Sequence, residues 1–190
     1  MSRWQANPKQ RLEQAALDLF IEQGFAETTV PEITARAGLT KRTFFRHFTD
    51  KREVLFTHEE QLTPIVASLM AGAPASFSPL RLIKLALETV AVTRFEVQFE
   101  YLHRRRVIVQ SDEGLRERET RRQSILSEAI SRGFVDRGVD ELSAILAAQI
   151  AVSVLNVSVD RWLDEEGKRP LSDIIRGSLV TLQSVLAEPA

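Results

Sequence analysis

The chain has 190 residues, of which 44% are hydrophobic and 27% are charged. This length and balance are typical of a soluble globular protein with a buried core, and they exclude an intrinsically disordered chain. The sequence has no cysteine, which excludes disulfides, thiol nucleophiles and cysteine-ligated metal sites. Because residues 1–9 contain no apolar run, we expect no signal peptide and a cytoplasmic protein.

The net charge of −1 conceals a strongly basic segment. Residues 33–52 contain six Lys or Arg residues against a single acidic residue, Asp50. The preceding residues 13–32 contain five acidic residues and no basic one. Basic charge is therefore concentrated in one short segment rather than spread over the whole surface.

The N-terminal segment has helical spacing with clear start and stop signals. Asn7 is placed to cap a first helix that has Pro8 in its first turn, and Gly24 is placed to end this helix. Thr29 and Glu32 have the spacing of a capping box, which predicts a second helix near residues 30–36.

A third helix is predicted near residues 41–46, with Thr40 as its N-cap. Gly38 lies between the second and third helices and permits a sharp reversal of the chain, so this region is predicted to be a helix-turn-helix. In such a motif the outward side chains of the second helix reach base edges in the major groove. These outward positions are Lys41, Arg42, Thr43, Arg46 and His47.

A fourth helix is predicted near residues 51–63, because Asp50 and Glu53 form a second capping box. Lys51 opens this helix and is a candidate for a contact with the DNA backbone.

The residues of this region together resemble the N-terminal domain of TetR/AcrR-type transcriptional regulators. The resemblance covers residues 11–55. It is carried by Ala15-Ala16-Leu17-Asp18-Leu19-Phe20, Glu22-Gln23-Gly24-Phe25, Thr28-Thr29-Val30, Glu32-Ile33, Ala37-Gly38-Leu39-Thr40, Thr43-Phe44-Phe45, His47-Phe48 and Lys51.

The resemblance implies a homodimeric, ligand-responsive regulator that binds a palindromic DNA operator, usually as a repressor. It also implies which residues contact DNA. Phe45 stands where this family often has Tyr, so the contact of a phenol hydroxyl with a phosphate is lost here. The implied phosphate contacts are Thr29, Thr40, His47 and Lys51, and the implied base-edge contacts are Lys41, Arg42 and Thr43.

The predicted fold is all-α, with a helix-turn-helix domain at residues 1–55 and a helical ligand-binding and dimerisation domain at residues 56–190. The Ala-Gly-Ala-Pro-Ala-Ser stretch at residues 71–76 reads as a linker or loop. The helices predicted after it are 79–110, 113–135, 140–163 and 171–187.

One face of the predicted helix 79–110 is apolar but includes Arg94, with Gln98 beside it. Polar groups on an apolar face need partners. These two residues either hold the polar head of a ligand whose body contacts Phe95, Phe99 and Tyr101, or belong to a buried ion pair or a partly exposed helix. The sequence leaves the identity of the ligand open: it could be a hydrophobic or aromatic molecule or a fatty acyl-CoA. For an acyl-CoA, the arginines of residues 103–122 would be candidates for binding its phosphates.

Residues 144–159 are apolar but too short and too often interrupted to span a membrane, so they predict a buried helix. Residues 171–187 carry an apolar stripe. Pairing of these two helices across a two-fold axis matches the four-helix dimer interface that the resemblance implies, and a purely intramolecular core is the alternative. The candidate interface residues are Ala151, Leu155, Ile175, Leu179, Leu182 and Leu186.

Catalysis is not predicted. The three histidines lie far apart, and the sequence shows no metal-ligand spacing, phosphate loop or nucleophile elbow, so no catalytic residue, metal or cofactor is expected. The alternative to a ligand-controlled regulator is an architectural or adaptor protein that uses the helix-turn-helix without an inducer.

Overall fold

The computed structural model describes residues 7–57 and 62–187, and in these residues the secondary structure is helical without strands, which confirms the predicted fold class. The first elements are α1 (Pro8–Gln23), α2 (Val30–Ala37), α3 (Lys41–His47) and a 3-10 turn (Glu53–Leu55). The remaining ones are α4 (Leu62–Gly72), α5 (Pro79–Val90), a π-helical turn (Ala91–Phe95), a 3-10 turn (Glu96–Gln98), α6 (Phe99–Ser111), α7 (Glu113–Val135), α8 (Glu141–Asp164) and α9 (Leu171–Leu186).

The chain divides into two compact units. The first unit comprises residues 1–60 and 103–119, and the second comprises residues 61–102 and 120–190. Helix α7 begins in the first unit and continues into the second. The predicted boundary at residue 55 does not account for residues 103–119, which belong to the first unit. The assignment of residues 1–55 and 56–190 as functional domains stays a prediction.

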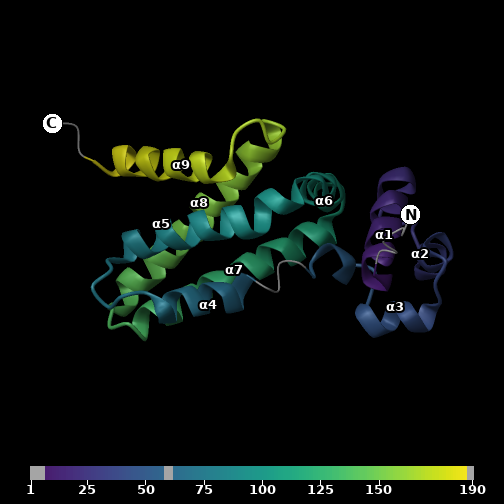
Figure 1. Ribbon diagram of the computed structural model, residues 1–190, viewed down its shortest axis with the longest axis horizontal. Coiled ribbons are helices and arrows are strands. Elements are labelled where there is room, and N and C mark those ends of the chain that lie inside the picture. Colours follow the sequence, from purple (N-terminus) through teal and green to yellow (C-terminus); the bar gives the residue numbers. More distant parts are fainter. Residues whose placement is uncertain (1–6, 58–61, 188–190) are drawn as a thin grey trace, which may run out of the picture. The chain divides into compact units, whose positions relative to one another are not determined.

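In the first unit, α1, α2 and α3 pack around a shared apolar core (Figure 1). The N–H of Lys9 donates to the side chain of Asn7, and Pro8 occupies the first turn of α1, as predicted. Gly38 has a φ of 62°, so it lies in the left-handed region that glycine tolerates, and it ends α2. The core side chains with almost no exposed surface include Leu12, Ile33, Phe44, Phe48 and Phe56.

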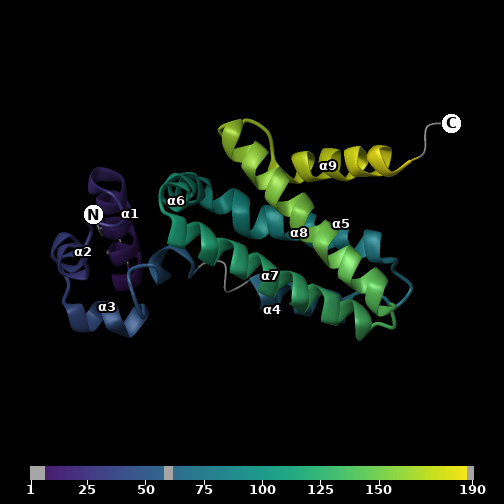
Figure 2. The same ribbon diagram turned by 180° about the vertical axis from the view of Figure 1, so that it is seen from behind.

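The second unit is built from α5, α8 and α9, which contact one another, together with α4, which packs on α5 (Figures 1 and 2). Small residues of α8 let the helices approach closely, because Ala144, Ala147, Ala148 and Ala151 are all buried. By length and composition alone α8 could span a membrane, but this alanine face is buried in the core of the unit.

Two predicted helices differ from the structure. The predicted helix 79–110 is interrupted at residues 91–98, where a π-helical and a 3-10 turn separate α5 from α6. The predicted helix 51–63 is reduced to a 3-10 turn before residue 57, and residues 58–61 lie outside the described part of the chain. The Asp50 side chain does accept from the N–H of Glu53, at 2.9 Å. The Glu53 carboxylate, however, accepts from the N–H of Thr49 rather than from that of Asp50, so the capping box is incomplete.

Candidate functional site

Helix α3 has one buried side and one exposed basic side. Phe44 lies in the core, with its ring centroid 5.3 Å from that of Phe48. The opposite side exposes Lys41, Arg42 and Arg46. Because the buried aromatic rings fix the rotation of α3, the cationic side chains are held on its outer face, where helix-turn-helix proteins contact the major groove.

Phe45 shares this exposed side of α3. Its side chain is 57% exposed and its ring meets Phe44 edge-on, with the centroids 5.4 Å apart. An exposed aromatic ring among cations offers an apolar contact for a thymine methyl group or a sugar. Phe45 is therefore also a candidate for a contact with DNA, although it lacks the hydroxyl group of the tyrosine that the family often has here.

The threonines predicted to contact phosphates act as helix caps in the structure. Thr29 Oγ1 donates to Glu32 Oε2 at 2.7 Å, and this hydrogen bond, with one from the Thr29 N–H, lowers the pKa of the Glu32 carboxyl. The N–H of Thr43 donates to Thr40 Oγ1 at 3.2 Å, and the hydroxyls of these two threonines lie 3.1 Å apart. Thr29 and Thr40 are both exposed at helix N-termini, where backbone N–H groups favour an anion.

Lys51 has partners inside the first unit. Its Nζ donates to the carbonyls of Phe25, Ala26 and Thr28 at 2.7, 3.0 and 2.8 Å, and it lies 4.5 Å from the centroid of the Phe25 ring. Burial lowers the pKa of this ammonium. An ammonium has three N–H bonds, so a phosphate contact would require Lys51 to give up one of these carbonyls. In this arrangement Lys51 orders the loop between α1 and α2.

His47 is half-buried at the end of α3, and its Nε2 is buried without a hydrogen-bond partner. A buried ring nitrogen without a partner is energetically unfavourable in the free protein. The predicted phosphate contact of His47 would supply one, and it stays a prediction.

The arginines of α6 and α7 bind protein groups of the first unit. Arg104 pairs with Asp18 at 2.5 Å, and Arg118 lies 3.7 Å from Asp50. Arg105 is buried, donates to the Leu55 carbonyl at 2.6 Å and pairs with Glu119. These contacts occupy three of the arginines named above as phosphate-binding candidates for an acyl-CoA.

Phe56 lies between two of these arginines. The guanidinium carbons of Arg105 and Arg118 lie 4.8 and 5.2 Å from the centroid of its buried ring. Cation–π contacts of this kind, with the ion pairs around them, attach residues 103–119 to α1 and to residues 50–56. This contact could not be predicted from the sequence, because it joins residues about 50 positions apart.

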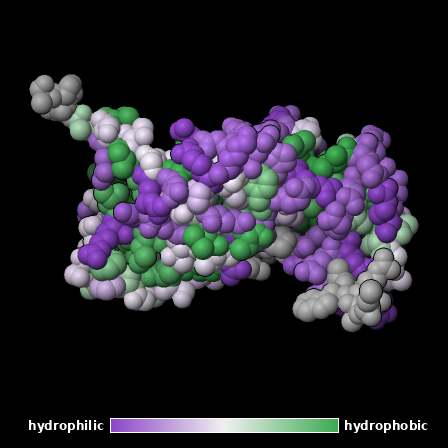
Figure 3. All heavy atoms as spheres, turned by 45° about the horizontal axis from the view of Figure 1, so that its top comes forward, coloured by the Kyte–Doolittle hydropathy of each residue, from purple (hydrophilic) through white to green (hydrophobic). Residues whose placement is uncertain are grey.

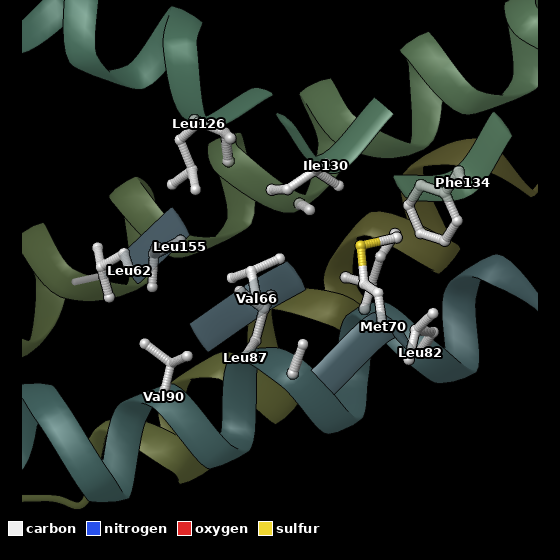
Figure 4. A pocket seen from close by; sticks show the side chains of 14 residues that line it. Leu62, Val66, Met70, Leu82, Leu87, Val90, Leu126, Ile130, Phe134 and Leu155 are labelled. Carbon is white, nitrogen blue, oxygen red and sulfur yellow. The ribbon is translucent and has the colours of Figure 1, made fainter. Parts of the chain in front are cut away.

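The second unit contains an apolar cavity with an empty volume of about 490 Å³, part of it open to solvent. Four helices contribute to its wall: Val66 and Met70 come from α4, Leu87 from α5, Ile130 and Phe134 from α7, and Leu155 from α8. Figure 4 shows these side chains pointing toward one another.

The five residues predicted to bind a ligand are not part of this wall. Phe99 packs edge-on against Trp162 with ring centroids 5.0 Å apart, and Gln98 Nε2 donates to the Arg94 carbonyl at 3.0 Å. Phe95, Phe99 and Tyr101 are partly buried against the core of the second unit. A ligand role for these residues stays a prediction, while the apolar wall was missed because its leucines and valines have the same helical spacing as ordinary core residues.

The candidate dimer interface stays a prediction. Ala151, Leu155, Ile175 and Leu179 are buried in the core of their own chain. Leu182 is half-buried and Leu186 is 69% exposed. Figure 3 shows hydrophobic side chains at the surface of the second unit. On α8 and α9 the exposed apolar residues are Leu142, Ile145, Leu146, Val157, Val180, Val185 and Leu186.

Comparison with known sequences finds a family match over α1 to α3. Residues 13–57 match the family described as bacterial regulatory proteins, tetR family. The chain is 34% identical over 82 residues, 43% of its length, to the HTH-type transcriptional regulator TcmR of Streptomyces glaucescens. It is 31% identical over 88 residues, 46% of its length, to the regulator SrpR of Pseudomonas putida. The matches cover 36% of TcmR and 38% of SrpR, so the chain spans well under half of either relative.

Comparison with solved structures extends over nearly the whole chain. Thermus thermophilus FadR, a TetR-family transcriptional repressor in complex with lauroyl-CoA, has a TM-score of 0.60 at 20% identity, with 96% of each chain covered. The SmeT–triclosan complex has a TM-score of 0.65 at 18% identity, with 96% of this chain and 98% of that chain covered. At such identities the likeness concerns the fold, a helix-turn-helix followed by a helical domain.

Proposed function

Since residues 13–57 match the tetR family of bacterial regulatory proteins, we propose that the chain binds a palindromic DNA operator and regulates transcription. The observation that carries the proposal is the exposed basic side of α3, where Lys41, Arg42 and Arg46 stand opposite the buried Phe44. Lys41, Arg42 and Thr43 contact base edges, and the helix N-termini at Thr29 and Thr40 contact phosphates.

The protein acts in the cytoplasm as a homodimer. Two recognition helices that read successive major grooves must lie roughly 34 Å apart, which requires two copies of the chain. The exposed apolar residues of α8 and α9 support this pairing, because a two-fold contact between the same surfaces would remove them from water.

A small hydrophobic molecule releases the protein from DNA. The cavity supports this control in preference to the alternative, an architectural protein without an inducer. FadR and SmeT are described in complex with lauroyl-CoA and triclosan, so ligands of apolar character occur on this fold. A ligand shifts the equilibrium only if it prefers the conformation that does not bind DNA.

Two helices link the cavity to the DNA-binding residues along the chain. Helix α4, which supplies Val66 and Met70 to the wall, follows the buried residues Val54 to Phe56 of the first unit. Helix α7 carries Arg118 and Glu119 in the first unit and Ile130 and Phe134 in the wall. We therefore assign the ligand-driven motion to α4, together with α7.

The test is fluorescence anisotropy of the full chain on DNA from beside its own gene, at several salt concentrations, with Lys41→Ala as the control. Tight binding that exceeds binding to random DNA, and that Lys41→Ala reduces by about 1–3 kcal/mol at one base position per half-site, supports the proposal. Equal affinity of the wild type and the variant for both DNAs would contradict the role of α3.

A further inference from the structure

We infer that Met70 and Gly133 set the size of the cavity and that its ligand is a neutral, apolar molecule rather than an anionic one. The inference rests on the ligand-controlled function proposed above and deepens it. It concerns the wall between α4 and α7, where the two residues meet.

The chemistry of the wall determines the class of ligand. All fourteen described residues that line the cavity are apolar. In the side chains drawn in Figure 4 the only atom other than carbon is the sulfur of Met70. A carboxylate or phosphate placed among these side chains would lose its water without gaining a hydrogen-bond donor, which is strongly unfavourable. A hydrocarbon chain or an unsubstituted aromatic ring loses nothing polar and is stabilised by leaving water.

Met70 occupies space that the absence of a side chain at Gly133 leaves open. A Cβ atom added at Gly133 would lie 2.7 Å from Met70 Sδ and 3.0 Å from Met70 Cε, closer than atoms can pack. The Met70 side chain is buried, and in Figure 4 its sulfur lies near Phe134 at one end of the cavity. Glycine at this position therefore lets Met70 lie against α7.

The backbone of Met70 is held in place from the other side. Arg137 Nη1 donates to the carbonyls of Met70 and Ala73 at 2.7 and 3.1 Å, and its Nη2 donates to that of Pro74 at 2.6 Å. These bonds tie the C-terminal end of α4 to the end of α7. A methyl group at position 133 must therefore displace the flexible Met70 side chain rather than the helix, and the displaced side chain enters the cavity.

The test is binding of the neutral fluorescent probe 1-N-phenylnaphthylamine to the full chain without DNA. We expect saturable binding that Gly133→Ala weakens about tenfold or more, because one methylene in an apolar pocket changes affinity by this order. The control is Gly72→Ala on α4, where an added Cβ meets no atom within 4 Å, and it should bind the probe as the wild type does.

A double variant separates loss of cavity volume from misfolding. Met70→Ala in the Gly133→Ala chain removes the displaced side chain and should restore probe binding. Unchanged binding by Gly133→Ala, an equal loss in Gly72→Ala, or no recovery in the double variant would overturn the role of the pair.

Competition with a matched pair of ligands tests the ligand class. Methyl decanoate should displace the probe at a concentration about tenfold or more below that of decanoate, since only the latter brings an unpaired charge. Equal potency would overturn the assignment to neutral ligands. Because the assay contains no DNA, failure to bind an operator would contradict the proposed function while leaving this result intact. Binding of the ester without release of DNA would likewise contradict only the proposed ligand control.

Discussion

The interior of each unit is stabilised by a different kind of contact. In the first unit, long cationic side chains reach backbone carbonyls: Arg11 donates to Ala37, Lys51 to three carbonyls including that of Phe25, and Arg105 to Leu55. In the second unit Arg137 also donates to backbone carbonyls, at one end of α4, but the core around α8 is built mainly from alanine, leucine, isoleucine and valine and borders an apolar cavity.

This difference matches what each unit is proposed to bind. A surface that reads DNA must hold several charged side chains in a fixed arrangement, and directional hydrogen bonds to the backbone provide that rigidity. A cavity for an apolar molecule requires only space and adaptable walls, which apolar packing leaves available. Four substitutions test this contrast, given from the largest expected effect to the smallest.

The core of the first unit depends on Phe44, which has no exposed surface. Phe44→Ala should lower the free energy of unfolding by about 3–5 kcal/mol because it leaves a cavity among the packed rings. The measurement is urea denaturation followed by circular dichroism. Phe45→Ala is the matched control, since this neighbouring ring is 57% exposed, and it should change stability by about 0.5 kcal/mol or less. Equal losses in both variants would contradict the orientation of α3.

The apolar surface of the second unit is tested by Leu146→Glu. Leu146 is 55% exposed on α8, so the single chain tolerates the change, but a dimer contact would bury an unpaired carboxylate. We expect the dimer dissociation constant to rise about tenfold or more, equivalent to about 1.4 kcal/mol, in sedimentation equilibrium. Leu85→Glu on α5, where Leu85 is 42% exposed, should leave the dimer intact. A dimeric Leu146→Glu protein would place the interface elsewhere.

The polar connections of the first unit are tested by Lys51→Met, which keeps the length of the side chain but removes its three hydrogen bonds. We expect a loss of about 1–3 kcal/mol in the free energy of unfolding. The salt dependence of DNA binding should change little if Lys51 keeps its carbonyl partners. A salt slope reduced by about one, with unchanged stability, would instead show that Lys51 contacts a phosphate.

The smallest effect is expected at the exposed turn between α8 and α9. Hydrogen bonds from Arg169 and Arg161 lower the pKa of Glu165 from 4.5 to about 2. A carboxylate with a lowered pKa stabilises the folded state above its unfolded pKa, and this contribution is lost as the pH falls toward the folded value. The difference in urea midpoint between the wild type and Glu165→Gln should therefore shrink from pH 7 to pH 3. A difference that stays constant with pH would contradict this contribution of Glu165 to stability. The control is Glu117→Gln on α7.

Local signals in the sequence located most of the helices. The prediction for α7 matches the structure at both ends, and α8 and α9 agree within a residue, because their first and last turns carry recognisable caps and glycines or prolines. The resemblance to TetR/AcrR-type regulators is likewise confirmed, since it was carried by residues that lie close together in the chain.

Features that depend on contacts between distant residues could not be predicted from the sequence. The break at residues 91–98 has no glycine or proline to mark it, and it coincides with tertiary contacts such as that of Glu96, which accepts from the N–H of Ser172 at 3.1 Å. The partners of Lys51 and the burial of Ile175 and Leu179 also depend on packing. The cavity was missed because its wall has the composition of a core, so only the structure separates wall from core.

The most direct test of the central claim is selection of bound sequences from a randomised pool of double-stranded DNA by the full chain, in parallel with Lys41→Ala. The account predicts enrichment of a palindrome whose half-sites lie about one helical turn, roughly 10 base pairs, apart, and reduced enrichment at specific base positions for the variant. A pool that shows no enriched sequence, or the same one for both proteins, would contradict DNA recognition through α3.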